Sequence, residues 1–271
     1  MMASASKRTF RVQLPDGAVL SGSSTGEGSP VLLLSGLGGS EAFWQDVRQG
    51  LPGYRCIAFD QRGIGASTRG SAVVTVAQLA QDCLAVLDVL GVGPVHAVGH
   101  STGGCIVQEM ALMQPDRLHS LFLGGTWAGP DEYMAALFSL RDEILQRSPE
   151  CYERLGLLLS YPAQWLREHP EKLAAAVQVS WTPARVAVVR ERIAALLTHD
   201  RRGQLQAVRS PCLVVGAADD QVVPLHLQRE LARLLPAARL EVLETGAHFF
   251  PVARRLKYLE ILQSWLGGQD S

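Results

Sequence analysis

The feature that most constrains the fold of this chain is the alternation of short apolar runs with segments of helical periodicity. The apolar runs are Val31–Leu34, Tyr54–Phe59, Val95–Val98, Leu118–Leu123, Cys212–Val215 and Leu240–Leu243. Continuous apolar runs are typical of strands buried on both faces, and parallel strands need long crossovers, which are usually helices. The pattern therefore predicts an α/β protein whose central sheet is mostly parallel, with helices on both faces.

The predicted crossovers and the start of the chain complete this pattern. The helical segments are Val76–Leu90, Gly103–Met113, Leu225–Leu235, Val252–Leu266 and a stretch carrying Phe43, Trp44 and Val47. Ser40 is placed to cap the last of these. The turn Pro15-Asp16-Gly17 separates the β-rich runs Phe10–Leu14 and Ala18–Gly22, which predicts an opening hairpin.

Residues 125–210 break the rhythm, because they show helical patterns and no clear strand. We expect helices over Asp131–Arg147, Glu150–Ser160, Glu171–Trp181 and Pro183–Thr198, interrupted at Pro149, Pro162 and Pro170. The α/β alternation resumes at Cys212. The prediction is one α/β core formed by residues 1–124 and 211–271, into which residues 125–210 are inserted as a helical cap, or lid.

Composition limits the partners of the chain. Its 271 residues include 25 Lys and Arg against 26 Asp and Glu, so no net field would recruit nucleic acid or an anionic membrane. No run approaches the roughly 20 apolar residues of a membrane span, and the opening segment lacks the apolar stretch of a secretory signal. We expect a small-molecule substrate and neither nucleic acid nor membrane as a partner; a homodimer stays open.

The cysteines are odd in number and scattered. They are Cys56, Cys83, Cys105, Cys151 and Cys212. Each lies among apolar residues and none forms a C-x-x-C pair, which predicts reduced thiols in the core rather than a zinc or redox site. The pattern predicts a cytoplasmic protein.

The sharpest local signal is Gly99-His100-Ser101-Thr102-Gly103-Gly104, between an apolar run and a helical pattern. A serine on a strand-to-helix turn takes a strained backbone conformation, and glycines two residues to either side let strand and helix pack closely around it. The helix N-terminus beneath it favours the negative charge of a tetrahedral intermediate. The placement predicts a nucleophile at Ser101, although the same letters can form a plain glycine turn.

A serine nucleophile needs a base and an acid that orients the base. Asp219 and Asp220 follow the run Cys212–Val215, and His248 follows the run Leu240–Leu243. Because the carboxyl ends of parallel strands lie along one edge of a sheet, these loops can meet there. Taken singly, the residues suit a turn former and a surface histidine. Taken jointly, they predict a triad in the order serine, acid, histidine.

Taken together, the motifs resemble those of the α/β-hydrolase superfamily over nearly the whole chain. The resemblance rests on Ser35-Gly36-Leu37-Gly38, Asp60-Gln61-Arg62-Gly63-Ile64-Gly65-Ala66-Ser67, Gly99 to Gly103, Asp220 to Pro224 and Gly246-Ala247-His248. Within the superfamily, Leu34 to Gly39 and Tyr161 to Leu166 are most similar to the aminoacrylate hydrolases and 3-oxoadipate enol-lactonases. The resemblance implies the α/β-hydrolase fold with an inserted lid.

The resemblance also implies roles for individual residues. The backbone N–H groups of Leu37 and Thr102 would form an oxyanion hole, and the family's acid, four residues before a proline, selects Asp220 over its neighbour Asp219. Ser35 departs from the histidine that is usual at its position. That change leaves the backbone donor intact but removes a brace for the loop.

Other polar residues have more ordinary interpretations. Arg62 is expected to tie loops together by forked hydrogen bonds, and His100 to pack beside Ser101 without a catalytic role. We expect Trp127, Trp165 and Trp181 in packing or a pocket wall. The predicted cap is rich in arginines, most of them expected on solvated helix faces and one of them a candidate clamp for a substrate carboxylate: Arg141, Arg147, Arg154, Arg167, Arg185, Arg190, Arg192, Arg201 and Arg202.

The sequence therefore predicts a serine hydrolase of the carboxylic-ester type, acting on a small ester, lactone or related acyl substrate through Ser101, Asp220 and His248. No metal or organic cofactor is implied. Haloalkane dehalogenases and epoxide hydrolases need a carboxylate nucleophile, so Ser101 counts against both. Cofactor-free haloperoxidases, carbon–carbon hydrolases and hydroxynitrile lyases keep the same triad, and a ligand-binding protein could keep the shell; these alternatives stay open.

Overall fold

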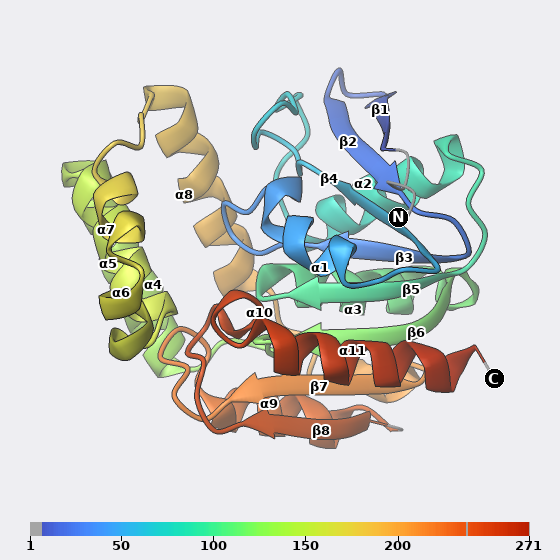
Figure 1. Ribbon diagram of the computed structural model, residues 1–271. Helices are drawn as coiled ribbons and strands as arrows, with labels where there is room; N and C mark the ends of the chain where they lie inside the picture. The colour runs from blue at the N-terminus through green and yellow to red at the C-terminus, as the bar shows by residue number, and fades with distance from the viewer. Residues whose placement is uncertain (1–6, 237, 271) are drawn as a thin grey trace, which may run out of the picture.

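One mixed sheet runs through the molecule in a computed structural model that describes residues 7–236 and 238–270. The strands are β1 (Arg8–Gln13), β2 (Val19–Thr25), β3 (Ser29–Leu34), β4 (Tyr54–Phe59), β5 (Val95–His100), β6 (Leu118–Gly124), β7 (Cys212–Ala217) and β8 (Ala238–Leu243). Their order is β1-β2-β4-β3-β5-β6-β7-β8. The pairs β1·β2 and β2·β4 are antiparallel and all other neighbours are parallel, which confirms the predicted mostly parallel sheet (Figure 1).

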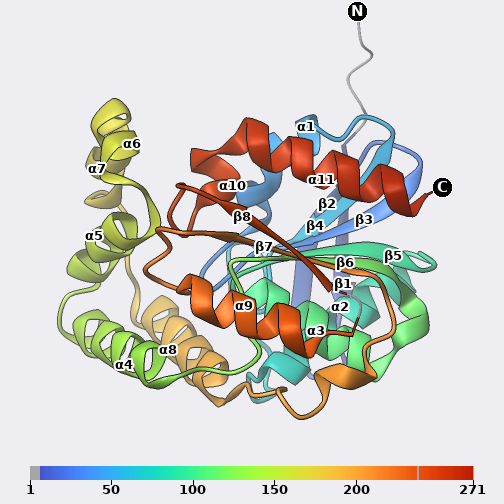
Figure 2. The same ribbon diagram turned by 90° about the horizontal axis from the view of Figure 1, so that it is seen from below.

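Helices cover both faces of this sheet and one of its ends. They are α1 (Gln45–Gln49), α2 (Val76–Val89), α3 (Thr102–Met113), α4 (Glu132–Arg147), α5 (Pro149–Ser160), α6 (Ala163–Glu168), α7 (Pro170–Ala176), α8 (Pro183–Thr198), α9 (Leu225–Leu234), α10 (Phe250–Ala253) and α11 (Arg255–Gln269), with short 3-10 turns η1 (Glu41–Trp44), η2 (Pro115–Arg117) and η3 (Leu205–Ala207). Helices α2, α3 and α9 lie on one face and α1, α10 and α11 on the other, while α4 to α8 lie at the carboxyl ends of the parallel strands (Figure 2).

Strand β3 shows why the apolar runs are continuous. Leu32 and Leu34 pack into the hydrophobic cluster that contains α2 and α3, whereas Val31 and Leu33 pack into the cluster that contains Trp44 and α11. All four strand residues are at most 1% exposed. Burying each such side chain contributes about 1.5–3 kcal/mol, so both faces of the strand favour this position at the centre of the sheet.

The predicted elements of the α/β alternation are present, including the opening hairpin. The helix predicted after Ser40 consists of the 3-10 turn η1 and the short helix α1, and the Ser40 hydroxyl caps η1 by accepting a hydrogen bond from the Ala42 N–H. The segment predicted as one helix over Val252–Leu266 consists of α10 and α11, which meet at Arg254. Sequence periodicity therefore located the elements of the sheet and its crossovers well.

Residues 125–210 differ more from their prediction. Helix α6 was not expected, and the helix expected over Glu171–Trp181 ends at Ala176. Pro149 and Pro170 begin helices rather than interrupt them, because proline fits the first helical turn. Helices α4 to α8 lie between β6 and β7, as the insertion requires; that residues 125–210 form a cap distinct from the core stays a prediction.

The structure shows where the cysteines lie and whether any helix could span a membrane. Four cysteines are buried and free, but Cys151 is exposed on α5, so the expectation that every cysteine belongs to the core is wrong for this one. Among the described residues, no helix is long and apolar enough to cross a membrane. In the same part of the chain, no group of three or more His, Cys, Asp or Glu is arranged to hold a metal ion.

Candidate active site

Ser101 occupies the turn between β5 and α3 in a backbone conformation that serine rarely takes, with φ 58° and ψ −127°. The flanking glycines leave no room for a side chain. A Cβ at Gly99 would lie 2.4 Å from the Gly103 oxygen, and a Cβ at Gly103 would lie 2.1 Å from the Leu34 oxygen. The strand, the helix and β3 can meet only because both positions are glycine, and the close packing holds Ser101 in its strained turn.

His248 and Asp220 meet at the carboxyl ends of the strands. His248 Nδ1 lies 2.9 Å from Asp220 Oδ2, and both residues are buried. Asp220 Oδ1 accepts from the backbone N–H groups of Val222 and Val223, each at 2.9 Å, so its carboxylate is fixed in place. When Nδ1 donates to the carboxylate, Nε2 is the ring nitrogen left to act as a base.

The neighbouring Asp219 has a separate task. Its carboxylate accepts from the backbone N–H groups of Ala247 at 2.8 Å and Gly246 at 3.2 Å, in the loop that carries His248. Ala247 has a positive φ of 50°, which these bonds help to maintain. The structure thus brings Asp220 to the imidazole ring and Asp219 to the backbone of the same loop.

Ser101, His248 and Leu37 line one cavity of about 880 Å³. No hydrogen bond joins Ser101 Oγ to the His248 ring among the described residues, although such bonds are often long in enzymes without substrate. The loop of residues 35–39 lies directly over the nucleophile, since a Cβ at Gly36 would be 2.8 Å from the Ser101 Cβ. Thr102 begins α3 beside it, so the two predicted oxyanion donors come from elements that meet at Ser101.

The walls of the cavity are aromatic and cationic. Its phenyl, phenol and indole rings belong to Phe43, Phe138, Tyr152, Trp181 and Phe249. The Arg141 guanidinium lies 5.1 Å from the Phe138 ring and 4.8 Å from the Tyr152 ring, and Arg185 lies 4.2 Å from the Trp181 ring. Glu153 also lines the cavity; burial raises its pKa, against the opposing effect of both arginines. Periodicity did not show which arginines of residues 125–210 would face the cavity.

His100 packs as predicted. Its ring centroid lies 5.5 Å from that of Phe43 and 4.9 Å from that of His248. Burial holds the pKa of His100 well below its usual value, with a further contribution from His248. A neutral ring of this kind supports His248 by contact.

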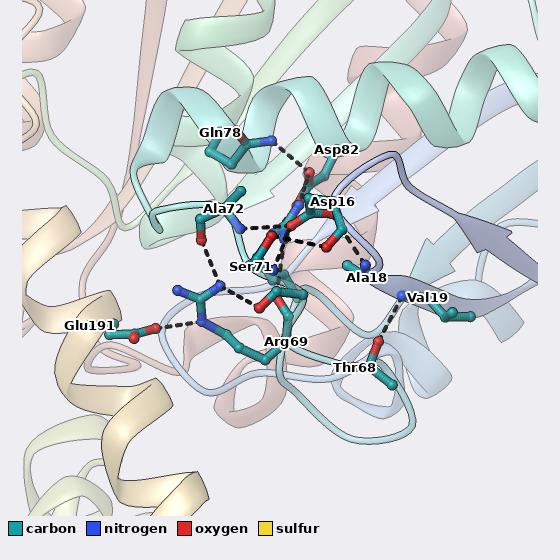
Figure 3. A network of polar contacts seen from close by, with 12 residues as sticks. Asp16, Ala18, Val19, Thr68, Arg69, Ser71, Ala72, Gln78, Asp82 and Glu191 are labelled. Atoms are coloured by element: carbon teal, nitrogen blue, oxygen red, sulfur yellow. Dashed lines mark hydrogen bonds and ion pairs between the residues drawn. The ribbon is translucent and has the colours of Figure 1, made fainter.

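Arg62 ties loops together, which confirms its predicted structural role. Its Nε and Nη2 donate to the two oxygens of Asp82 at 2.9 and 2.7 Å, and its Nη1 donates to Asp16. Figure 3 shows the surrounding network, in which Asp16 also accepts from the backbone N–H groups of Ser71 and Ala72.

Arg192 on α8 is an exception to the expectation that most arginines of residues 125–210 lie on solvated helix faces. It is 1% exposed, and its Nη2 donates to Gln61 Oε1 and, at 3.4 Å, to the Gly36 oxygen. Gln61 Nε2 in turn donates to the Ser35 oxygen at 2.7 Å. The signal was present in the sequence: Arg192 lies three and four residues after the apolar Val189 and Val188, on the buried face of the helix.

Comparisons with known proteins agree with this architecture. Residues 29–252 match the family described as the alpha/beta hydrolase fold. A relative from Azorhizobium caulinodans, provisionally named carbamate hydrolase RutD, is 34% identical over 249 residues, which cover 90% of this chain and 94% of the relative.

Solved structures share the same fold. A hydrolase from Pseudomonas aeruginosa superposes with a TM-score of 0.85 at 26% identity, covering 96% of this chain and 98% of that one. The enol-lactonase from Burkholderia xenovorans has a TM-score of 0.81 at 20% identity and covers 96% of both chains. The resemblance inferred from the motifs is confirmed: this chain belongs to the α/β-hydrolase fold family, and it is a hydrolase.

Proposed function

We propose that this hydrolase uses Ser101 as nucleophile, His248 as general base and Asp220 as the acid that orients it, on a small ester, lactone or related acyl substrate. The observation that carries the proposal is the 2.9 Å hydrogen bond between His248 and Asp220, placed beside a cavity that Ser101 also lines. A buried carboxylate held by two backbone N–H groups keeps the imidazole in one tautomer, as a general base requires.

In the proposed reaction, His248 Nε2 takes the proton of Ser101 as its Oγ attacks the substrate carbonyl. The negative charge on the carbonyl oxygen is met by the N–H groups of Leu37 and Thr102. His248 then gives the proton to the leaving oxygen or nitrogen, and an acyl group remains on Ser101. A water molecule, deprotonated by the same base, releases the acid and restores the Ser101 hydroxyl. The net change is addition of one water across the acyl bond.

The cavity supports a particular kind of substrate. A volume of about 880 Å³ with aromatic walls holds more than a two- or three-carbon acid. Three arginines and one glutamate line it, and Arg69 among them pairs with Glu191, which leaves Arg141 and Arg185 against Glu153. Arg141 Nε has no hydrogen-bond partner in the part of the chain described. We therefore propose a substrate with an apolar body and one anionic group, and Arg141 as the candidate clamp.

Relatives favour a second substrate class. Proteins 34 to 36% identical to this chain are provisionally named carbamate hydrolases. A carbamate carbonyl can undergo the same attack by Ser101, with a carbamoyl group in place of the acyl group. Matched nitrophenyl esters and carbamates separate the two classes.

The test is covalent labelling with a fluorophosphonate probe, read by intact mass, on wild type and on Ser101→Ala, alongside hydrolysis of short-chain nitrophenyl esters. We expect one label and turnover in wild type and neither in the variant, with activity lost by about 10⁴-fold or more. Esters that end in a carboxylate should be preferred to their methyl-capped analogues. If wild type is unlabelled and inert, a ligand-binding role replaces this proposal. If it is labelled but cleaves neither esters nor carbamates, product analysis decides among the haloperoxidase, carbon–carbon hydrolase and lyase alternatives.

A further inference from the structure

The proposed chemistry depends on the orientation of one peptide group, the one that joins Gly36 to Leu37. Its N–H belongs to Leu37 and is a proposed oxyanion donor, while its carbonyl oxygen belongs to Gly36. The N–H and C=O of a planar trans peptide point in opposite directions. Whatever holds the Gly36 oxygen therefore fixes the direction of the Leu37 N–H.

The loop itself holds this oxygen weakly. Within the loop, the Gly36 oxygen accepts only from the Gly39 N–H, at 3.4 Å, among the described residues. Gly38 has a positive φ of 92°, and the loop lacks the histidine brace expected at position 35. Glycines on both sides of Leu37 give this peptide more freedom to rotate than a loop of branched residues would allow.

Arg192 and Gln61 hold the loop from behind. Arg192 Nη2 donates to the Gly36 oxygen at 3.4 Å and to Gln61 Oε1, and Gln61 Nε2 donates to the Ser35 oxygen at 2.7 Å. Two consecutive carbonyl oxygens of the loop are thus tied to one pair of buried side chains. Arg192 comes from α8, within residues 125–210, so the contact joins that helix to the loop over Ser101.

Among the described residues, no carboxylate is in direct contact with the Arg192 guanidinium, although Asp82 lies close enough for its field to act on it. In the same part of the chain, the Nε and Nη1 of Arg192 have no hydrogen-bond partner. Burial lowers the pKa of Arg192 to about 10, opposed by the field of Asp82, so the guanidinium stays charged at neutral pH. A buried charge without a partner costs several kcal/mol, so stability alone does not account for it. A cation at the carbonyl end of a peptide polarises the bond and strengthens its N–H as a donor.

We infer that Arg192 is a positioning residue for the oxyanion hole, holding the Gly36–Leu37 peptide with its N–H directed toward Ser101, both directly and through Gln61. The inference rests on the proposed function, because it assigns Arg192 to the transition state of that reaction. If Arg192 has this role, the oxyanion hole can form only when α8 is packed in the position that brings Arg192 to the loop. The arginine acts through the peptide and does not line the substrate cavity.

The test compares Arg192→Met, Arg192→Lys and wild type in three measurements: kcat and KM for a nitrophenyl ester, the second-order rate of fluorophosphonate labelling, and inhibition by a trifluoromethyl ketone that forms a tetrahedral adduct on Ser101. For Arg192→Met we expect kcat and the labelling rate to fall together by about 100-fold, weaker inhibition by the ketone, and little change in KM. Arg192→Lys keeps the charge and a single donor nitrogen on a shorter side chain, so it should recover part of the loss.

Arg190→Met is the matched control, because Arg190 lies two residues earlier on α8 and pairs with Asp142 away from the loop. It should keep the kcat of wild type. If Arg192→Met is less stable but reacts at the wild-type rate per folded molecule, Arg192 is only structural and the inference fails. If it does not fold, Arg192→Lys and Gln61→Met carry the test, and wild-type rates in both overturn the inference. A wild type that takes no label at Ser101 overturns the proposed function and this inference with it.

Discussion

Two arginines are almost completely buried in this molecule, and their surroundings are opposite. Arg62 and Arg192 are each 1% exposed. Arg62 makes a two-pronged contact with Asp82 and a further one with Asp16, so its charge is compensated twice. Arg192 meets only neutral oxygens, those of Gln61 and Gly36, and two of its nitrogens are unpartnered. Equal burial therefore conceals two different electrostatic situations.

The two arginines should differ in what their removal changes: the stability of the fold for Arg62 and the rate of the proposed reaction for Arg192. Removing one partner of a buried ion pair strongly destabilises the protein, because the other charge is left buried and unpaired. A buried cation that contacts no carboxylate leaves no such partner behind, so its removal should cost less stability. Arg62 holds together the turn after β4 and the opening hairpin, whereas Arg192 supports the loop over the proposed nucleophile. We expect mutations to separate stability from activity along this line.

The largest expected effect on stability is that of Arg62→Met. It leaves Asp82 buried without its partner, and we expect the free energy of unfolding to fall by about 3–5 kcal/mol. Urea titration followed by circular dichroism measures this loss, and kcat per folded molecule should stay near that of wild type. Arg8→Met removes an exposed ion pair with Glu27 and serves as the control, with a change below about 1 kcal/mol. If Arg192→Met lowers the free energy of unfolding as much as Arg62→Met does, the proposed difference between the two arginines is wrong.

Arg62 and Arg192 also show which contacts could be predicted from the sequence and which could not. The motif around Arg62 predicted a tie between loops, and the strand runs placed Ser101, Asp220 and His248 at one edge of the sheet. Local pattern is enough there, because a strand end fixes where the next residues lie. The partner of Asp219 and the contacts of Arg192 depend on loops and helices distant in sequence. Residues 125–210 have no strand register to fix them, which is why α6 and the end of α7 were missed.

An intermediate effect is expected on acid stability. Burial alone would raise the pKa of Asp16, but Arg62 and the N–H groups of Ala72 and Ala18 outweigh it and hold the pKa well below its usual range. In the unfolded chain an aspartate has a pKa of about 3.9, so as the pH falls the Asp16 carboxylate is protonated in the unfolded state before it is protonated in the folded state. The stabilisation is complete above pH ~4 and is lost as pH falls through the lower folded value.

Asp16→Asn removes this pH-dependent share of stability. Its free energy of unfolding should be lower than that of wild type at pH 6 and should decrease less steeply between pH ~4 and ~2. Urea midpoints across that range measure the slope. Parallel slopes for the two proteins would mean that Asp16 does not carry the acid sensitivity of the Arg62 network.

The smallest effect is expected next to Arg192 itself. Glu191 lies beside it on α8 and pairs with Arg69 at 2.6 Å, from the turn that Arg62 also supports (Figure 3). The Glu191 side chain is 44% exposed, and exposed pairs contribute about 0–1 kcal/mol. Glu191→Gln should therefore leave kcat at the wild-type value and shift the unfolding midpoint only slightly. If Glu191→Gln instead lowers kcat as much as Arg192→Met, the position of the whole helix sets activity, and the contact with the Gly36–Leu37 peptide is not its specific cause.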